Sequence, residues 1–209
     1  MPTNLVEALR LMLVTDDRWL RDGDPAALVE ACRAAERGGA TSVQLRLKTV
    51  PARALAEVAR ALVAALRVPV LLNDRPDVAL AVGAAGAHLG ADDLPLALAR
   101  RIAPEGFVLG GSVGSEPEAV HNAAADYWGI GPWRATATKS DAGDALGETG
   151  FRRLVALAGG RPCVAIGAVR PEDVPLVRAA GGAGVAVVSG ILGADDVEAA
   201  ARAYRAAGA

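Results

Sequence analysis

The sequence predicts a single-domain α/β protein in which eight parallel strands alternate with helices to form a closed (β/α)8 barrel. Two observations carry this prediction. Short apolar runs alternate eight times with longer runs rich in alanine, leucine, arginine and glutamate, and polar residues collect where the apolar runs end. Eight such units are typical of the TIM barrel, whereas the main alternative is an open, doubly wound sheet. The units are short, so we expect one catalytic domain over residues 1–209.

Each of the first four units begins with an apolar run of strand length and continues into a helical run that starts near a proline. The expected pairs are Leu11–Asp16 with a helix from Pro25 to Arg37, Ser42–Lys48 with a helix from Pro51 to Leu66, Val68–Asp74 with a short helix from Pro76, and Ala87–Ala91 with a helix from Pro95. The first turn is where a proline costs least, because an N–H there has no partner within the helix.

The last four units follow the same pattern, with a longer loop in the sixth. The expected pairs are Phe107–Val113 with a helix from Glu116, Tyr127–Trp133 with a helix near Glu148–Leu157, Cys163–Val169 with a helix from Pro171, and Gly184–Gly190 with a helix from about Ala194. Active sites of such barrels lie at the carboxyl ends of the strands, so polar residues at these ends are candidate site residues.

Composition excludes several classes of function. The net charge of −2 gives no reason to expect nucleic acid or an anionic membrane as a partner. No apolar run approaches the roughly 18 residues of a membrane span, and the first ten residues lack a signal-peptide pattern. We therefore expect a cytoplasmic protein that acts on small molecules, and a homo-oligomer is compatible with the sequence. Cys32 and Cys163 have no metal-binding spacing and are expected to be buried.

The second strand carries an alternating polar set at its end. Gln44, Arg46 and Lys48 are two residues apart and therefore share one face, which in a barrel strand is the interior face. Two neighbouring cations inside a barrel repel each other unless an anion neutralises them. A bound diphosphate fits this pattern, and a salt-bridged plug in the barrel floor is the alternative.

Two carboxylates, Asp74 and Asp93, follow neighbouring strands and would suit Mg²⁺, which takes few protein carboxylates besides water and substrate phosphate. In the alternative interpretation, Asp74 pairs with Arg46 or Arg75, and Asp93 or its neighbour Asp92 caps the next helix. His88 is expected to be an inward ring held by a hydrogen bond.

A second anion site is expected at strands six to eight. Thr136, Thr138 and Lys139 follow the sixth strand and offer two hydroxyls and an ammonium for phosphate oxygens. The pairs Gly167-Ala168 and Ser189-Gly190 end strands seven and eight, where many barrels bind phosphate. The two sites favour a reaction driven by stabilising a departing phosphate group.

These motifs, in this order and spacing, resemble the thiamine phosphate synthase family from the first strand to Ser189. The matching pieces are Gln-Leu-Arg-x-Lys at 44–48, Asn73-Asp74-Arg75, His88-Leu89-Gly90-x-Asp92-Asp93, Gly110-x-Ser112, Asp126-Tyr127 with Gly129-x-Gly131-Pro132, Thr136-x-Thr138-Lys139, Ala165-Ile166-Gly167 and Gly184 to Ser189. One short motif alone would carry little weight, but the whole set in this order and spacing is specific to this family.

The resemblance implies a Mg²⁺-dependent transferase that joins a hydroxymethylpyrimidine diphosphate to a thiazole phosphate, or its carboxylated form, and releases pyrophosphate after the diphosphate has departed. It also implies a role for each motif residue. The pyrimidine diphosphate would be held by Gln44, Arg46, Lys48, Asn73, Ser112 and Lys139, the metal by Asp74 and Asp93, and the thiazole phosphate by Thr136, Thr138, Ala168, Val188 and Ser189. Lys48, Ser112 and Lys139 are the expected catalytic residues.

Four positions depart from the family pattern: Ala91, Trp133, Arg134 and Ala168. Ala168 replaces a glycine and restricts φ, whereas Arg134 replaces an aromatic residue.

Two other functions stay open. A thiazole tautomerase, a relative with this fold, is disfavoured because the diphosphate and metal set is present. A catalytically silent phosphate-binding regulator is the other alternative. Turnover of both substrates would favour the synthase over this regulator.

Overall fold

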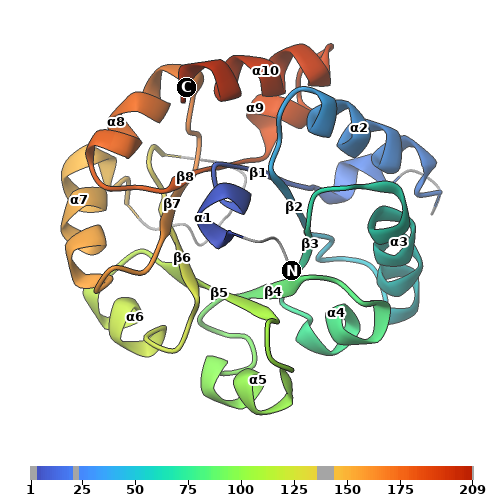
Figure 1. Ribbon diagram of the computed structural model, residues 1–209, viewed down its shortest axis with the longest axis horizontal. Helices are drawn as coiled ribbons and strands as arrows, with labels where there is room; N and C mark the ends of the chain where they lie inside the picture. Colours follow the sequence, from blue (N-terminus) through green and yellow to red (C-terminus); the bar gives the residue numbers. More distant parts are fainter. Residues whose placement is uncertain (1–3, 21–23, 136–143, 209) are drawn as a thin grey trace.

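The computed structural model describes residues 4–20, 24–135 and 144–208. Eight parallel strands stand in a ring at the centre of the molecule, and helices surround it (Figure 1). The strands are β1 (Leu11–Val14), β2 (Ser42–Leu45), β3 (Val70–Asn73), β4 (Gly86–Leu89), β5 (Val108–Val113), β6 (Tyr127–Ile130), β7 (Cys163–Ile166) and β8 (Gly184–Val187).

Each strand pairs in parallel with the next one along the chain, and β8 closes the ring by pairing with β1. The closing register places Leu11 opposite Val185 and Leu13 opposite Val187. This closure confirms the predicted barrel and rules out the open doubly wound sheet.

Most of the helices begin where the prolines predict, although Pro171 begins only a short 3₁₀ helix and the α-helix follows from Val174. Pro25, Pro51 and Pro95 directly precede their helices, and Pro76 and Pro117 lie in a first turn. The helical elements are α1 (Leu5–Ala8), η1 (Asp17–Trp19), α2 (Ala26–Arg37), α3 (Ala52–Ala65), α4 (Pro76–Val82), α5 (Leu96–Ile102), α6 (Glu116–His121), α7 (Gly147–Leu157), η2 (Pro171–Asp173), α8 (Val174–Ala179), α9 (Ser189–Leu192) and α10 (Val197–Ala207). Within the described residues, none of these helices is long and apolar enough to span a bilayer.

Two apolar cores hold the barrel. The larger one lies between the strands and the surrounding helices, and it contains both Cys32 and Cys163, which are buried as predicted. The smaller one fills the inside of the barrel. Its buried members are Leu9, Met12, Val14, Leu71, Val108, Tyr127, Val164 and Ala186.

Helix α1 was not predicted from the sequence. It lies over the middle of the strand ring in Figure 1, and Leu5 and Leu9 at its two ends pack against the inner core. Asn4 caps it by accepting a hydrogen bond from the amide of Val6. The helix thus covers the amino-terminal end of the barrel, so that the carboxyl ends of the strands surround the interior that remains accessible.

Most predicted strands were too long at their carboxyl ends. Strand β7 ends at Ile166 instead of Val169, and β8 ends at Val187 instead of Gly190. Beyond Ile166 the backbone leaves the sheet as a loop beside the cavity, and beyond Val187 it turns directly into α9. The last unit also contains two helices, α9 and α10, where one was predicted.

Candidate active site

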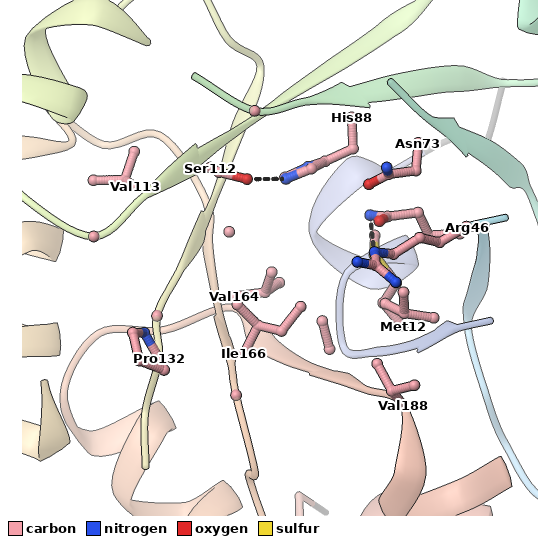
Figure 2. A pocket seen from close by; sticks show the side chains of 18 of the residues that line it. Met12, Arg46, Asn73, His88, Ser112, Val113, Pro132, Val164, Ile166 and Val188 are labelled. Carbon is pink, nitrogen blue, oxygen red and sulfur yellow. Dashed lines mark hydrogen bonds between the residues drawn. The ribbon is translucent and has the colours of Figure 1, made fainter. Parts of the chain in front are cut away.

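A cavity of about 760 Å³ lies at the carboxyl ends of the strands, and all eight strands contribute to its wall. This volume is in the range of pockets that hold small molecules and cofactors. Figure 2 shows that polar side chains gather on one side, with Arg46, Asn73, His88 and Ser112. Pro132, Val164, Ile166 and Val188 lie on the other side. The pocket therefore has a polar half, built from β2 to β5, and a more apolar half, built from β6 to β8.

The alternation predicted for the second strand is present. Gln44, Arg46 and Lys48 line the cavity, whereas Leu45 and Leu47 between them belong to the outer core. Arg46 and Lys48 lie just beyond the last residue of β2, at the mouth of the barrel. Because these cations line the open cavity, the alternative of a salt-bridged plug in the barrel floor does not hold.

A chain of hydrogen bonds crosses the polar half. The Tyr127 hydroxyl lies 2.9 Å from His88 Nδ1. His88 Nε2 lies 3.0 Å from Ser112 Oγ. Burial raises the pKa of the Tyr127 hydroxyl, so this group stays protonated. His88 is thus the inward, hydrogen-bonded ring that the sequence predicts, and the chain fixes the orientation of Ser112. Gln44 is held separately, by a 3.5 Å contact from its Nε2 to Met12 Sδ.

Gly110 makes this chain possible. It lies on β5 between His88 of β4 and Tyr127 of β6, and a methyl group there would come within 2.5 Å of His88 Nδ1 and 2.3 Å of the Tyr127 ring. We expect Gly110→Ala to lower the free energy of unfolding by about 3 kcal/mol, because both side chains must move out of the hydrogen-bonded arrangement. Urea denaturation measures this effect.

Gly83→Ala is the matched control. The added methyl meets nothing within 4 Å, but the backbone has a φ of 72°. Only the conformational cost of about 1 kcal/mol is expected there. Equal losses of unfolding free energy in the two variants would show that crowding of His88 and Tyr127 is not the cause of the destabilisation at Gly110.

Asp74 and Asp93 lie side by side on the cavity wall. Burial, followed by the neighbouring Asp93 carboxyl, raises the pKa of Asp74 to about 6, although Lys48 and Arg46 act in the opposite direction. Lys48 Nζ lies 3.9 Å from Asp74 Oδ2. Asp74 has a φ of 64°, which is strained for a residue with a side chain. An acidic pair that includes a residue with a strained backbone, at the mouth of a cavity, is typical of a functional site.

Two structural alternatives for these acids are not observed, the pairing of Asp74 with Arg75 and the capping of α5 by an aspartate side chain. Arg75 pairs with Asp77 at 2.7 Å. Pro95 occupies the N-cap of α5, with no side-chain cap, while Asp93 accepts a 2.6 Å hydrogen bond from the amide of Gly90. Asp93 therefore shapes its own loop and leaves one carboxylate oxygen for the cavity.

The acidic pair fits a hard divalent cation. Within the described residues, no group of three or more His, Cys, Asp or Glu side chains is placed to hold a metal. Two adjacent carboxylates are nevertheless what Mg²⁺ uses when water and substrate phosphate complete its shell. A cation bound by both carboxylates would also offset the repulsion from Asp93, which adds to burial in raising the pKa of Asp74.

The segment expected to bind the acceptor phosphate lies after β7 and at the start of α9, which follows β8. Ala168, Val188 and Ser189 all line the cavity there. Gly167 and Ala168 both have positive φ, 99° and 49° respectively. Gly167 needs this freedom, because a methyl group would lie 2.7 Å from Pro132.

The structure does not reach all the predicted site residues. Thr136, Thr138 and Lys139 lie outside the described residues. The structure also places residues in the wall to which sequence reasoning gave no role: Glu118, Tyr127, Arg170 and Tyr204. Tyr127 lies in an apolar run and resembles a core residue, and Tyr204 comes from the last helix, so only the folded arrangement brings them to the cavity.

Comparison with known proteins identifies relatives that match most of the chain. Residues 11–191 match the family model described as thiamine monophosphate synthase. The chain is 48% identical to a thiamine-phosphate synthase of Azorhizobium caulinodans over 93% of its own length and 92% of the relative's. It is 44% identical to a thiamine-phosphate synthase of Methanoculleus marisnigri, with 93% of each covered. A solved structure of thiamine phosphate pyrophosphorylase from Pyrococcus furiosus superposes with a TM-score of 0.86 at 35% identity, covering 98% of this chain and 97% of that one.

Proposed function

The chain belongs to the thiamine monophosphate synthase family and is a transferase, and on this premise we propose that its cavity joins a hydroxymethylpyrimidine diphosphate to a thiazole phosphate or its carboxylated form. The observation that carries the proposal is the division of the cavity into a cation-bearing polar half and a more apolar half. The polar half suits the diphosphate, and the apolar half suits the thiazole ring.

The residues of the polar half would bind and orient the diphosphate. Arg46 and Lys48 supply positive charge, while Asn73 and Ser112 supply neutral hydrogen-bonding groups at the same end of the cavity. Gln44 lies deeper, with 4% of its surface exposed. Its amide suits the edge of the pyrimidine ring.

In the proposed reaction, the bond between the pyrimidine methylene carbon and the diphosphate oxygen breaks first, and the oxygen keeps the electron pair. The thiazole nitrogen then donates its lone pair to the carbocation, so thiamine phosphate and pyrophosphate are the products. When bound at Asp74 and Asp93, Mg²⁺ would supply charge stabilisation to the departing diphosphate. Lys48, Ser112 and Lys139 would bind the same group as its negative charge grows, which is the interaction expected to contribute most to the rate.

The residues of the apolar half would hold the acceptor. Val188 and Ile166 offer apolar contact to the thiazole ring, and Ala168 and Ser189 lie where its phosphate would bind. Thr136 and Thr138 are proposed to add hydroxyl contacts to the same phosphate. This arrangement directs the thiazole nitrogen toward the polar half, where the reactive carbon forms.

The test is incubation of the protein with both substrates and Mg²⁺, followed by detection of thiamine phosphate. Product should form only when both substrates and the metal are present. Binding of the phosphates without turnover would instead favour the regulator. Conversion of a thiazole phosphate isomer without the pyrimidine substrate would favour the tautomerase.

Replacing Ala168 with glycine should improve acceptor binding. Ala168 has a φ of 49°, where glycine is relaxed, and the substitution also removes a methyl group from the cavity wall. We expect the KM for thiazole phosphate to fall roughly threefold and the KM for the pyrimidine diphosphate to stay unchanged. Steady-state kinetics with each substrate varied in turn measures both constants.

Ala91→Gly provides the control, because Ala91 also lines the cavity but lies beside the acidic pair at the opposite end. It should leave the KM for thiazole phosphate unaltered. Equal changes in both KM values of Ala168→Gly would count against two separate anion sites.

A further inference from the structure

An ion pair joins the loop that follows β6 to η2, the 3₁₀ helix that follows β7. Arg134 Nε donates to Asp173 Oδ2 at 3.1 Å, and Arg134 Nη2 makes a second, shorter contact with Oδ1. Asp173 is 1% exposed, whereas the Arg134 side chain is 43% exposed. Burial opposes ionisation of Asp173, but its hydrogen bonds to Arg134 and to the Arg170 amide outweigh that effect and lower its pKa. The carboxylate is therefore charged at neutral pH and depends on Arg134 for neutralisation.

The segment from Gly167 to Asp173, here called the acceptor loop, is attached to Arg134 at both ends. At its beginning, the Arg134 amide donates to the carbonyl of Gly167 at 3.0 Å. At its end, Asp173 Oδ2 accepts from the Arg170 amide at 2.9 Å while it holds the guanidinium. One residue thus fixes the loop through its backbone on one side and through its side chain on the other.

A third anchor holds the middle of the acceptor loop. The Tyr204 hydroxyl donates to the carbonyl of Val169 at 2.8 Å. Ala168, which has positive φ and lines the cavity, lies between the Gly167 and Val169 anchors. A conformation that is unfavourable for alanine persists only when its surroundings impose it, and these contacts do so.

We propose that Arg134 and Asp173 are positioning residues that hold the acceptor loop in the shape required by the anionic group of the acceptor substrate. The role of Ala168 rests on the proposed function. Arg134 is one of the departures from the family pattern, and its bidentate contact with Asp173 commits the guanidinium to the loop instead of the substrate. The pair acts through Ala168 and leaves the diphosphate end of the cavity untouched.

Kinetics on Arg134→Ala tests the proposal. The KM for thiazole phosphate should rise about 10-fold while the KM for pyrimidine diphosphate changes less than about twofold, since only the acceptor end is displaced. Arg134→Lys keeps the positive charge but lacks the planar guanidinium that makes two hydrogen bonds. Its KM for thiazole phosphate should lie between those of the wild type and Arg134→Ala. The control is Arg153→Ala, which removes an exposed arginine paired with Glu116 at 3.5 Å and should leave both constants unchanged. An unchanged KM for thiazole phosphate, or equal rises in both constants, would overturn the proposal.

Arg134→Ala leaves a buried carboxylate without its cation and is therefore the variant most at risk of unfolding. The double variant Arg134→Ala/Asp173→Asn removes both charges and keeps the size of the second side chain. It should fold and show the same selective rise in the acceptor KM. A double variant with the KM values of the wild type would overturn the proposal.

Hydrogen exchange separates this proposal from the proposed function. If the wild-type protein forms no thiamine phosphate, the function fails, but the acceptor loop can still be examined. The amide of Arg170 should exchange faster in the double variant than in the wild type, and amides of β2 should not. Unchanged exchange at Arg170 would refute the positioning role whatever the reaction is.

Discussion

Replacing Asp93 with asparagine is expected to lower kcat about 100-fold at low Mg²⁺, a loss of about 2.7 kcal/mol of transition-state stabilisation. The fold should survive, because an asparagine oxygen can still accept the Gly90 amide and because α5 does not use Asp93 as a cap. Only the negative charge beside Asp74 is lost. Turnover measured over a range of Mg²⁺ concentrations should show partial recovery at high concentration.

Two further variants sharpen this test. Asp77→Asn removes an acid that pairs with Arg75 at 2.7 Å on the exposed surface, and it should leave turnover unchanged. Asp92→Asn alters the neighbouring acid of the same loop, which also lines the cavity. Normal turnover by Asp93→Asn at low Mg²⁺ would refute the metal assignment, and a large loss in Asp92→Asn alone would move it to Asp92.

Lys139→Ala should lower kcat about 100-fold or more, because an ammonium that meets the departing diphosphate acts mainly in the transition state. The prediction rests on the sequence alone, since Lys139 lies outside the described residues. Thr136→Ala is the contrasting variant. Its hydroxyl is proposed to bind the acceptor phosphate, so it should raise the KM for thiazole phosphate with little change in kcat.

Steady-state kinetics on the two variants, with each substrate varied in turn, distinguishes the two roles. Lys139→Arg keeps the charge and should retain more activity than Lys139→Ala. If Lys139→Ala altered only the KM for thiazole phosphate, Lys139 would belong to the acceptor site. The assignment of Lys139 to the diphosphate and Thr136 to the acceptor phosphate would then be wrong.

The fold was predictable because its signals are local. A buried parallel strand is a short apolar run, and prolines such as Pro51 and Pro76 mark helix starts within one residue of their observed positions. Helix α1 was missed because four residues are too few to show a helical period. The ends of β7 and β8 were misplaced because apolar residues such as Val169 and Val188 continue beyond the last ladder pair.

The polar half of the site was also predictable, because the carboxyl ends of all strands in a parallel barrel surround the same cavity. The alternation of Gln44, Arg46 and Lys48 then fixes which face they occupy. What the sequence could not give is long-range geometry. The Tyr127 hydroxyl contacts His88, which is 39 residues away in the sequence. Arg134 pairs with Asp173 over the same separation. Both contacts depend on the strands being in register.

The backbone conformations of Asp74 and Ala168 were beyond sequence reasoning for a different reason. Both have positive φ, although neither is a glycine. Tertiary contacts impose these conformations against local preference, as with the Asp74 amide, which donates to the carbonyl of His88 at 2.9 Å. Such conflicts between local and tertiary preference are expected at functional sites.

The most direct measurement is a crystal structure of the wild-type protein with Mg²⁺, pyrophosphate and thiamine phosphate. Pyrophosphate should contact Arg46, Lys48 and Asn73 in the polar half, with the metal between it and the carboxylates of Asp74 and Asp93. The phosphate of thiamine phosphate should lie against Ala168 and Ser189. The reverse orientation, or a metal bound away from Asp74 and Asp93, would contradict a cavity divided into a diphosphate end and an acceptor end.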